Sequence, residues 1–191
     1  MPHTVKNKRI IFLDRDGVIN RELDGYLTEW SSFEFLPDAL DSLKFLKENG
    51  WTVIVITNQS AIGRGYATTE AINEIMAKMI AEVQASGGDI LDVIYCPHTP
   101  EDGCICRKPK SDLFYQAAEK HRIDLSDKWY IGDKLSDVEA AISASLKPIL
   151  IRGGKVVTGI SVTEDDAVAV VNNLSEAIEF IMEELKVNAD A

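Results

Sequence analysis

Two aspartates one residue apart, Asp14 and Asp16, directly follow the apolar run Ile10–Leu13. A short apolar run without alternation is typical of a strand buried on both faces of a parallel sheet. Because open α/β sheets bind ligands beyond the carboxyl ends of such strands, we expect both carboxylates at one site. Two close carboxylates need a cation, a proton or a basic neighbour to offset their repulsion. The stretch alone is equally compatible with a strand that ends in an ordinary Asp-Gly turn.

Three further groups of residues capable of chemistry lie where apolar runs or a cysteine cluster end: Thr57-Asn58, Arg107-Lys108, and Asp133 with Asp137. A carboxylate can attack phosphorus and form an acyl phosphate, which divides a difficult displacement into two easier steps. Mg²⁺ prefers hard oxygen ligands, and basic groups stabilise the charge on phosphoryl oxygens. Taken alone, the last pair is also compatible with a helix N-cap and an acid in the first helical turn.

All three cysteines and one of the three histidines lie between residues 96 and 106, as Cys96, His98, Cys104 and Cys106. This Cys₃His set could complete a tetrahedral Zn²⁺ site, and four protein ligands would make the zinc structural. The alternatives are a surface disulfide or free thiols, but clustering of every cysteine with a histidine favours zinc. Because the loop directly precedes Arg107 and Lys108, bound zinc would hold this basic pair near a phosphate.

The alternation of apolar runs and amphipathic segments predicts a doubly wound, mainly parallel α/β sheet. Strands are expected at 10–13, 51–56, 90–95, 129–131, 148–151 and 167–171, and helices at about 37–49, 68–85, 111–121, 136–145 and 175–185. Residues 20–35 lack a helical period and should form a flap or hairpin beside the first strand. The short connections leave no room for a large cap domain, so we expect a single domain over residues 1–191.

The composition is ordinary for a soluble globular protein, with 46% hydrophobic and 27% charged residues. The formal net charge of −11 argues against general affinity for nucleic acid or an anionic membrane. No apolar run approaches the roughly 20 residues that span a bilayer, and the N-terminus shows no signal-peptide core. We therefore expect a cytoplasmic protein with a small-molecule partner. Without heptads or surplus amphipathic faces, we expect a monomer.

Together these motifs resemble those of the haloacid dehalogenase (HAD) superfamily of phosphatases. The matching residues are Asp14-Arg15-Asp16-Gly17-Val18, Thr57, Lys108 and Gly132-Asp133-Lys134-Leu135-Ser136-Asp137. The resemblance covers about residues 9–152 and implies a Rossmann-like core. It implies that Asp14 is the nucleophile, and that Asp16 protonates the leaving oxygen and later accepts a proton from water. Thr57 and Lys108 would stabilise the transferred phosphoryl group.

The same resemblance implies a catalytic Mg²⁺ held by Asp14, Asp133 and Asp16, the last through its main-chain carbonyl. Asp137 would support this site by ordering a metal-bound water or by fixing the loop. The Cys-x-His and Cys-x-Cys-Arg-Lys-Pro arrangement resembles a narrower branch of small members without a large cap. That branch is shared by heptose bisphosphate phosphatases and histidinol-phosphate phosphatases, and it implies a structural Zn²⁺.

Within this branch, the flap and strand-end residues are most similar to phosphatases that remove the 7-phosphate of D-glycero-D-manno-heptose 1,7-bisphosphate. This implies a role in heptose nucleotide and lipopolysaccharide core biosynthesis. Arg107, with its planar fork, would suit the phosphate that is not cleaved. Arg64 could help, although it could equally be a solvated loop residue. The implied substrate contacts are Leu23, Asp24, Gly25, Tyr26, Asn58, Gln59, Ser60, Arg64, Arg107 and Lys134.

Three alternatives remain open. The short stretch between His98 and Cys104 is close to the histidinol-phosphate type, so a histidinol-phosphate phosphatase of histidine biosynthesis is the first alternative. Ser60 favours a sugar, because the histidinol-phosphate branch tends to carry an acid there, which suits a substrate amine. The second alternative is a non-catalytic, zinc-stapled binding module on the same fold. The third is a redox role for the cysteines.

Overall fold

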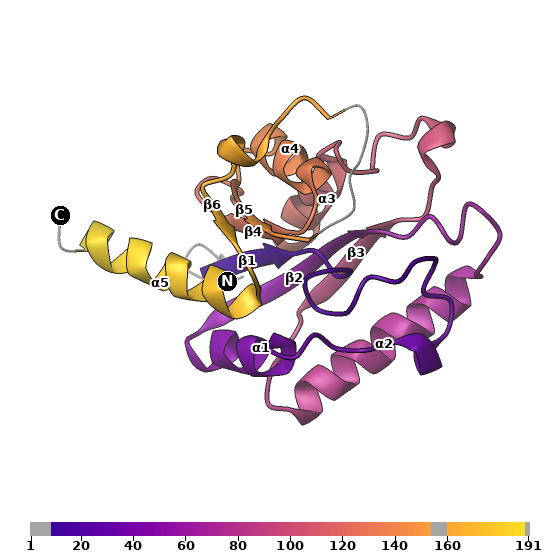
Figure 1. The fold of residues 1–191 in the computed structure, drawn as a ribbon, viewed down its shortest axis with the longest axis horizontal. Helices are drawn as coiled ribbons and strands as arrows, with labels where there is room; N and C mark the ends of the chain where they lie inside the picture. The colour runs from indigo at the N-terminus through magenta and orange to yellow at the C-terminus, as the bar shows by residue number, and fades with distance from the viewer. Residues whose placement is uncertain (1–8, 154–159, 190–191) are drawn as a thin grey trace, which may run out of the picture.

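The computed structural model describes residues 9–153 and 160–189, which form a six-stranded parallel sheet between two layers of helices (Figure 1). The strands are β1 (Arg9–Leu13), β2 (Trp51–Asn58), β3 (Asp92–Cys96), β4 (Trp129–Gly132), β5 (Lys147–Ile151) and β6 (Ala169–Val171). Their order in the sheet is β3-β2-β1-β4-β5-β6, and every neighbouring pair is parallel. The strand order reverses between β1 and β4, and ligands of such folds bind at this point. The predicted α/β class is confirmed.

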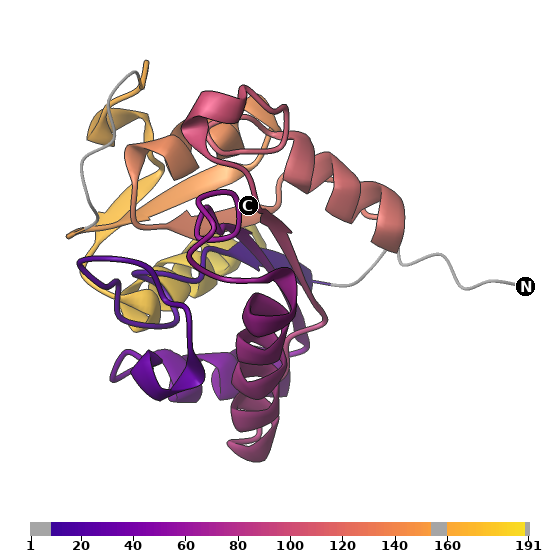
Figure 2. The same cartoon turned by 90° about the vertical axis from the view of Figure 1, so that its right-hand side faces the viewer.

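The helices cover both faces of the sheet (Figures 1 and 2). Helices α1 (Ala39–Glu48), α2 (Thr69–Ala85) and α5 (Leu174–Ala189) pack on one face, and α3 (Asp112–His121) and α4 (Leu135–Ser143) on the other. In β1, Ile11 and Leu13 join the first core, whereas Ile10 and Phe12 join the second. Because both faces of this central strand are covered, its buried residues Ile10–Leu13 are all apolar, and this explains the uninterrupted apolar run.

Strand β2 ends later than the sequence predicts. Thr57 and Asn58 still pair with Tyr95 and Cys96 of β3, so the ladder continues beyond the apolar residues. The polar side chains of Thr57 and Asn58 are therefore held by strand geometry and not by a loop. Helix α2 begins as predicted, because the Thr68 hydroxyl caps it by accepting the backbone N–H of Ala71 at 3.1 Å.

Residues 20–35 form a flap without the ladder of a hairpin. They contain a short 3₁₀ turn, η1 (Trp30–Ser32), and an isolated bridge between Asn20 and Phe35. The rings of Trp30 and Phe33 stack with centroids 4.6 Å apart, and both pack against the core beneath. Aromatic packing therefore anchors the flap beside the end of β1.

No helix among the described residues is both long and apolar enough to cross a membrane. Residues 1–8, 154–159 and 190–191 lie outside the described part of the chain. The expectation of a single domain over 1–191 includes these residues and stays a prediction.

Candidate active site

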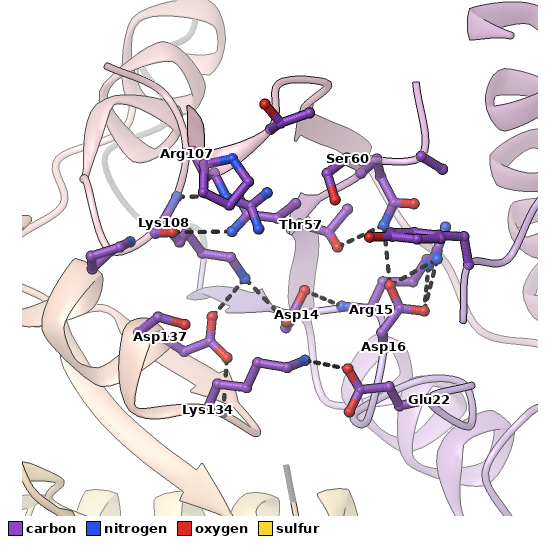
Figure 3. Close-up of a pocket in the computed structure, with 18 of the residues that line it drawn as sticks. Asp14, Arg15, Asp16, Glu22, Thr57, Ser60, Arg107, Lys108, Lys134 and Asp137 are labelled. Carbon is purple, nitrogen blue, oxygen red and sulfur yellow. Dashed lines mark hydrogen bonds and ion pairs between the residues drawn. The ribbon is translucent and has the colours of Figure 1, made fainter. Parts of the chain in front are cut away.

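A cavity of about 650 Å³ opens beyond the carboxyl ends of the central strands (Figure 3). It brings together most of the predicted site residues, which come from β1, the flap, the end of β2, the loop before α3 and the start of α4. Those that line it are Asp14, Asp16, Leu23, Asp24, Gly25, Tyr26, Thr57, Asn58, Gln59, Ser60, Arg107, Lys108, Lys134 and Asp137. Asp133 lines a second, adjoining cavity, and Arg64 is not among the described lining residues of either.

Asp14 is the first residue after β1, and its backbone N–H donates to the carbonyl of Ile131 in β4 at 2.8 Å. This bond anchors the residue at the point where the strand order reverses. One carboxylate oxygen accepts the backbone N–H of Arg15, and the other lies 3.1 Å from the Lys108 ammonium. Burial raises the pKa of Asp14 above its ordinary value, although Lys108 opposes the shift. Asp14 is therefore a buried carboxylate that faces the cavity and forms an ion pair with Lys108.

Asp14, Asp133 and Asp137 form a buried cluster in which one oxygen of each carboxylate lies within 4.8 Å of the others. Burial raises the pKa of Asp133 to about 8; Lys134 acts against this shift, and the charges of Asp137 and Asp14 add to it. A divalent cation would offset this repulsion, and Mg²⁺ takes hard oxygen ligands of this kind. The donor set therefore fits Mg²⁺.

Two glycines make room for the acids of this cluster. Gly17 has φ +80°, and a Cβ there would lie 2.1 Å from a carboxylate oxygen of Asp133. A Cβ on Gly132 would lie 2.4 Å from the Cβ of Asp137. Both Gly17 and Gly132 belong to the motifs that carried the predicted metal site, and here they allow the close approach of the acids.

Asp137 fixes the loop at the start of α4. One of its oxygens accepts the backbone N–H groups of Asp133 and Lys134 at 3.2 and 3.0 Å. Its other oxygen lies 2.6 Å from the Lys108 ammonium. Asp137 can therefore cap the N-terminus of α4 and support the site at the same time, because one oxygen accepts the backbone N–H groups and the other pairs with Lys108.

Asp16 points its carboxylate at Arg15, whose Nη2 lies 2.7 and 2.8 Å from the two oxygens. Asn20 and Gln59 donate to the same carboxylate at 2.9 and 3.1 Å. Although burial alone would raise it, the charge and hydrogen bonds of Arg15 lower the pKa of Asp16. In this conformation Asp16 is an ionised, fully engaged acceptor. Arg15 and Asn20 were missed in the sequence, because nothing in their pattern separates them from solvated residues.

Thr57, Gln59 and Asn58 are held by one another and by the loop before α3. The Gln59 amide donates to both Thr57 Oγ1 and Asp16, each at 3.1 Å, and only 4% of Gln59 is exposed. Asn58 exchanges hydrogen bonds with the backbone of Lys108, accepting its N–H and donating to its carbonyl, both at 3.1 Å. Asn58 and Gln59 thus support neighbouring site residues in addition to lining the cavity.

Lys108 and Lys134 are the cations nearest the acids. The Lys108 side chain is 2% exposed and lies against Asp14, Asp137 and the hydroxyl of Tyr130. Lys134 reaches across from the start of α4 to Glu22 of the flap at 3.0 Å and to Asp133 at 3.1 Å (Figure 3 shows the pair with Glu22). Sequence reasoning missed Tyr130 and Glu22, since one lies in an apolar strand and the other in an irregular segment.

The two predicted arginines differ in position. Arg107 lines the cavity, and its guanidinium donates to the carbonyl of His98 at 3.3 Å. Arg64 forms an ion pair at 3.5 Å with Glu101 of residues 96–106, the segment that carries the three cysteines and is called the cysteine loop below. The substrate contact of Arg64 stays a prediction, and its visible role is to tie the loop after β2 to the cysteine loop.

The four predicted zinc ligands converge. Cys96 Sγ lies 3.1 Å from Cys106 Sγ and 3.6 Å from Cys104 Sγ, and His98 Nδ1 lies 3.3 Å from Cys106 Sγ. These separations exceed an S–S bond of about 2.05 Å, so the cysteines are not paired as disulfides. They approach the edge lengths of a tetrahedron around an ion with bonds of about 2.0–2.3 Å. The donor set and spacing fit a structural Zn²⁺.

Comparisons with a family model and with known proteins all point to the same family of hydrolases. The family model of the haloacid dehalogenase-like hydrolases matches residues 5–145. The D-glycero-beta-D-manno-heptose-1,7-bisphosphate 7-phosphatase of Pseudomonas putida is 40% identical over 147 residues, which cover 77% of this chain and 84% of the relative. The Haemophilus ducreyi protein of the same name is 35% identical over 182 residues, which cover 91% and 98%.

Among solved structures, the D,D-heptose 1,7-bisphosphate phosphatase from B. bronchiseptica, complexed with magnesium and phosphate, superposes with a TM-score of 0.81. It is 32% identical, and the alignment covers 92% of this chain and 99% of that one. With both the sequence family and the fold in agreement, the chain belongs to the haloacid dehalogenase-like hydrolases.

Proposed function

We propose that this protein is a Mg²⁺-dependent phosphatase that removes the 7-phosphate of D-glycero-β-D-manno-heptose 1,7-bisphosphate. The observation that carries the proposal is the position of Asp14, which faces the cavity, forms an ion pair with the Lys108 ammonium and belongs to the acid cluster with Asp133 and Asp137. The names of the relatives support the substrate and its β anomer. The magnesium and phosphate in the B. bronchiseptica structure support the metal and the reaction class.

In the proposed reaction, a carboxylate oxygen of Asp14 attacks the phosphorus of the 7-phosphate. The bond to the sugar oxygen breaks, and the phosphoryl group is carried on Asp14 as an acyl phosphate. Thr57 and Lys108 donate hydrogen bonds to the phosphoryl oxygens, where negative charge is concentrated during transfer. When bound, Mg²⁺ would be held by Asp14, Asp133 and the main-chain carbonyl of Asp16, and would neutralise phosphoryl charge. Water then hydrolyses the acyl phosphate and regenerates Asp14.

Asp16 is the proposed proton carrier in both steps, and its surroundings define what it must do. It gives a proton to the leaving sugar oxygen and later takes one from the attacking water. Because Arg15 now occupies both oxygens and lowers the pKa of Asp16, the proposal requires Asp16 to rotate away from Arg15 toward the leaving group and to take up a proton from solvent before the first step. The Gln59 amide donates hydrogen bonds to both this carboxylate and Thr57. A substrate contact that moves Thr57 would therefore also change the hydrogen bonding of Asp16.

Basic side chains gather at this cavity although the chain has a net charge of −11. Arg107, Lys108 and Lys134 line it, which suits a ligand with two phosphates. We propose that Arg107 binds the phosphate that is retained, since its planar fork matches a phosphate edge. The uncharged Ser60, which also lines the cavity, supports a sugar over a substrate with an amine. Heptose nucleotide and lipopolysaccharide core synthesis is the proposed pathway; cytoplasmic location and a monomeric state stay predictions.

A phosphate-release assay tests the proposal. Purified protein with Mg²⁺ is given the β and α anomers of the heptose bisphosphate and histidinol phosphate, and kcat/KM is compared. We expect the β anomer to be the preferred substrate. Asp14→Asn should lower kcat by roughly 10³-fold or more, because it removes the nucleophile. Asp41→Asn, the same change at an exposed position of α1, should leave kcat unchanged.

Two results would contradict the proposal. A higher kcat/KM for histidinol phosphate would identify the protein as a phosphatase of the alternative branch. Full activity of Asp14→Asn would mean that the measured phosphate release does not come from this site, and would favour the binding-module interpretation.

A further inference from the structure

Four oxygen atoms surround the Lys108 ammonium in the part of the chain that the structure describes. Asp137 and Tyr130 approach it most closely, each at 2.6 Å, and the carbonyl of Ile56 lies at 3.0 Å. The nucleophile Asp14 is the most distant of the four, at 3.1 Å. An ion pair of this type is ordinarily about 2.7–2.9 Å long, so the contact with the nucleophile is a loose one. The two closest neighbours therefore hold the ammonium slightly back from Asp14.

Tyr130 reaches the ammonium from the core side of the sheet. Its side chain is 1% exposed and packs edge-on against Phe114, with ring centroids 4.9 Å apart. Unlike Asp14, Lys108 and Asp137, it is not among the described residues that line the cavity. The ammonium lies 5.3 Å from the ring centre but only 2.6 Å from the hydroxyl oxygen, so it contacts the hydroxyl end and not the ring face.

The Tyr130 hydroxyl can both accept and donate a hydrogen bond among its buried neighbours. The ammonium has three protons and the hydroxyl has one. The hydroxyl lies 3.2 Å from the carbonyl of Ile56 and 3.1 Å from Asp137, so it can donate to either while it accepts from Lys108. Tyr130 is thus a neutral acceptor that draws the ammonium toward the core. It competes with Asp14 for the ammonium but adds no charge to the acid cluster.

We propose that Tyr130 is a positioning residue for the reaction, which it supports by holding the Lys108 ammonium off the nucleophile. Asp14 must present an oxygen to phosphorus, and a tight ion pair with Lys108 would stabilise that carboxylate before attack. With the Tyr130 hydroxyl in place, Lys108 can donate a hydrogen bond to the phosphoryl group without forming a tight ion pair with Asp14. Without the hydroxyl, the ammonium moves toward Asp14. This inference rests on the proposed function, since it assigns Asp14 as the nucleophile.

The test compares two tyrosine hydroxyls. Tyr130→Phe removes the one beside Lys108; Tyr115→Phe is the matched control, because its hydroxyl donates to the carbonyl of Ser143 and its ring is exposed on α3. We expect Tyr130→Phe to lower kcat about ten-fold with KM within about two-fold, since displacement of one catalytic group costs rate more than binding. Tyr115→Phe should match the wild type. Rates are taken at a temperature at which circular dichroism shows every variant folded.

A double-mutant cycle separates positioning from a general structural effect. In a Lys108→Met background, the same Tyr130→Phe change should cause no further loss of kcat, because its effect passes through Lys108. An equal loss in both backgrounds would overturn the inference, as would a wild-type kcat for Tyr130→Phe. Tyr130→Met, which lacks the hydroxyl but packs differently, should reproduce the loss of Tyr130→Phe; a wild-type kcat for it would count against the inference.

Assays with two substrates distinguish a failure of the proposed heptose substrate from a failure of the proposed role of Tyr130. All variants are assayed with the β-heptose bisphosphate and with p-nitrophenyl phosphate. Wild-type protein that cleaves only the second would contradict the proposed substrate, while a ten-fold kcat difference on that substrate would still support the role of Tyr130.

Discussion

Charged side chains at the bottom of the cavity are buried in mutually dependent pairs. Arg15 is 1% exposed and is committed to Asp16, while Lys108 is shared by Asp14 and Asp137. Removing one member of such a pair leaves an uncompensated buried charge, which typically costs about 3–5 kcal/mol. The rate of a variant at one of these charged residues therefore reports on activity only at a temperature at which the variant is shown to be folded. The glycines that make room for the acids are better probes, because they carry no charge themselves.

Gly17→Ala should weaken magnesium binding. A Cβ at Gly17 would lie 2.1 Å from a carboxylate oxygen of Asp133, so this proposed ligand must move. Gly50→Ala is the matched control, because Gly50 shares the positive φ, at +75°, but a Cβ there meets nothing within 4 Å. Backbone strain should lower the free energy of unfolding of each variant by about 1–2 kcal/mol, and the overlap with Asp133 should lower that of Gly17→Ala further. Only Gly17→Ala should lower magnesium affinity, by roughly ten-fold or more, as measured by calorimetric titration. Equal affinities for the two variants would contradict the assignment of Asp133.

The cysteine loop is an element with little hydrophobic packing of its own, and it delivers two basic residues to the cavity. Ile105, near the C-terminal end of the loop, is 70% exposed, whereas Cys96 and Cys106 are buried. Arg107 contacts this loop through the carbonyl of His98, and Lys108 follows it directly. The position of both basic residues therefore depends on the order of the loop, which the proposed zinc would supply.

Cys104→Ser should lower stability and activity together. We expect loss of bound zinc, a fall in the melting temperature of roughly 5 °C or more, and a lower kcat. Ile105→Ser, the neighbouring exposed position, should keep its zinc and its activity. Metal analysis by mass spectrometry and thermal unfolding provide the measurements. If the native protein contains no zinc, the proposal that zinc orders this loop and positions the two basic residues is wrong.

Helix α3 is joined to β3 by a cluster whose residues are not among the described residues that line the cavity. Asp92 lies 2.8 Å from Lys120 and 2.6 Å from His121. Although burial acts to raise it, hydrogen bonds from these two residues lower the pKa of Asp92 below its ordinary 3.8. A carboxyl with a lowered folded-state pKa stabilises the protein above its unfolded-state pKa, and this contribution is lost as the pH falls through the folded-state value.

Asp92→Asn should therefore lower the melting temperature at pH 7. The difference from the wild type should shrink as the pH falls below about 4, because protonation then removes the same charge from the wild type. Melting curves between pH 7 and pH 3 measure this effect. Asp89→Asn, at an exposed position just before β3, should show no comparable pH dependence. A constant difference across the range would show that charge is not the cause.

Over the whole molecule, the features that could be predicted from the sequence are those that depend on periodicity and motif spacing. The order of strands and helices follows from apolar runs and caps, and the Cys₃His set from clustering. The conformation of Asp16 could not be predicted, because it depends on the rotamer of Arg15 in a packed core. Tyr130 was equally hidden, since a tyrosine in an apolar strand looks like any other core residue. The assigned roles of the site residues, including Arg64 and Arg107, stay predictions.

The central place of β1 in the sheet has a consequence for how the protein folds. β1 pairs with β2 over five positions, and with β4, which comes more than a hundred residues later in the chain, over only three. Long-range pairings form late because their loop-closure entropy must first be overcome. Asp14, the proposed nucleophile, is synthesised before Asp133, and the two residues come together only when β4 pairs with β1. A chain that ends before β4 would lack Asp133 beside Asp14, so we expect activity to begin only when β4 has joined the sheet.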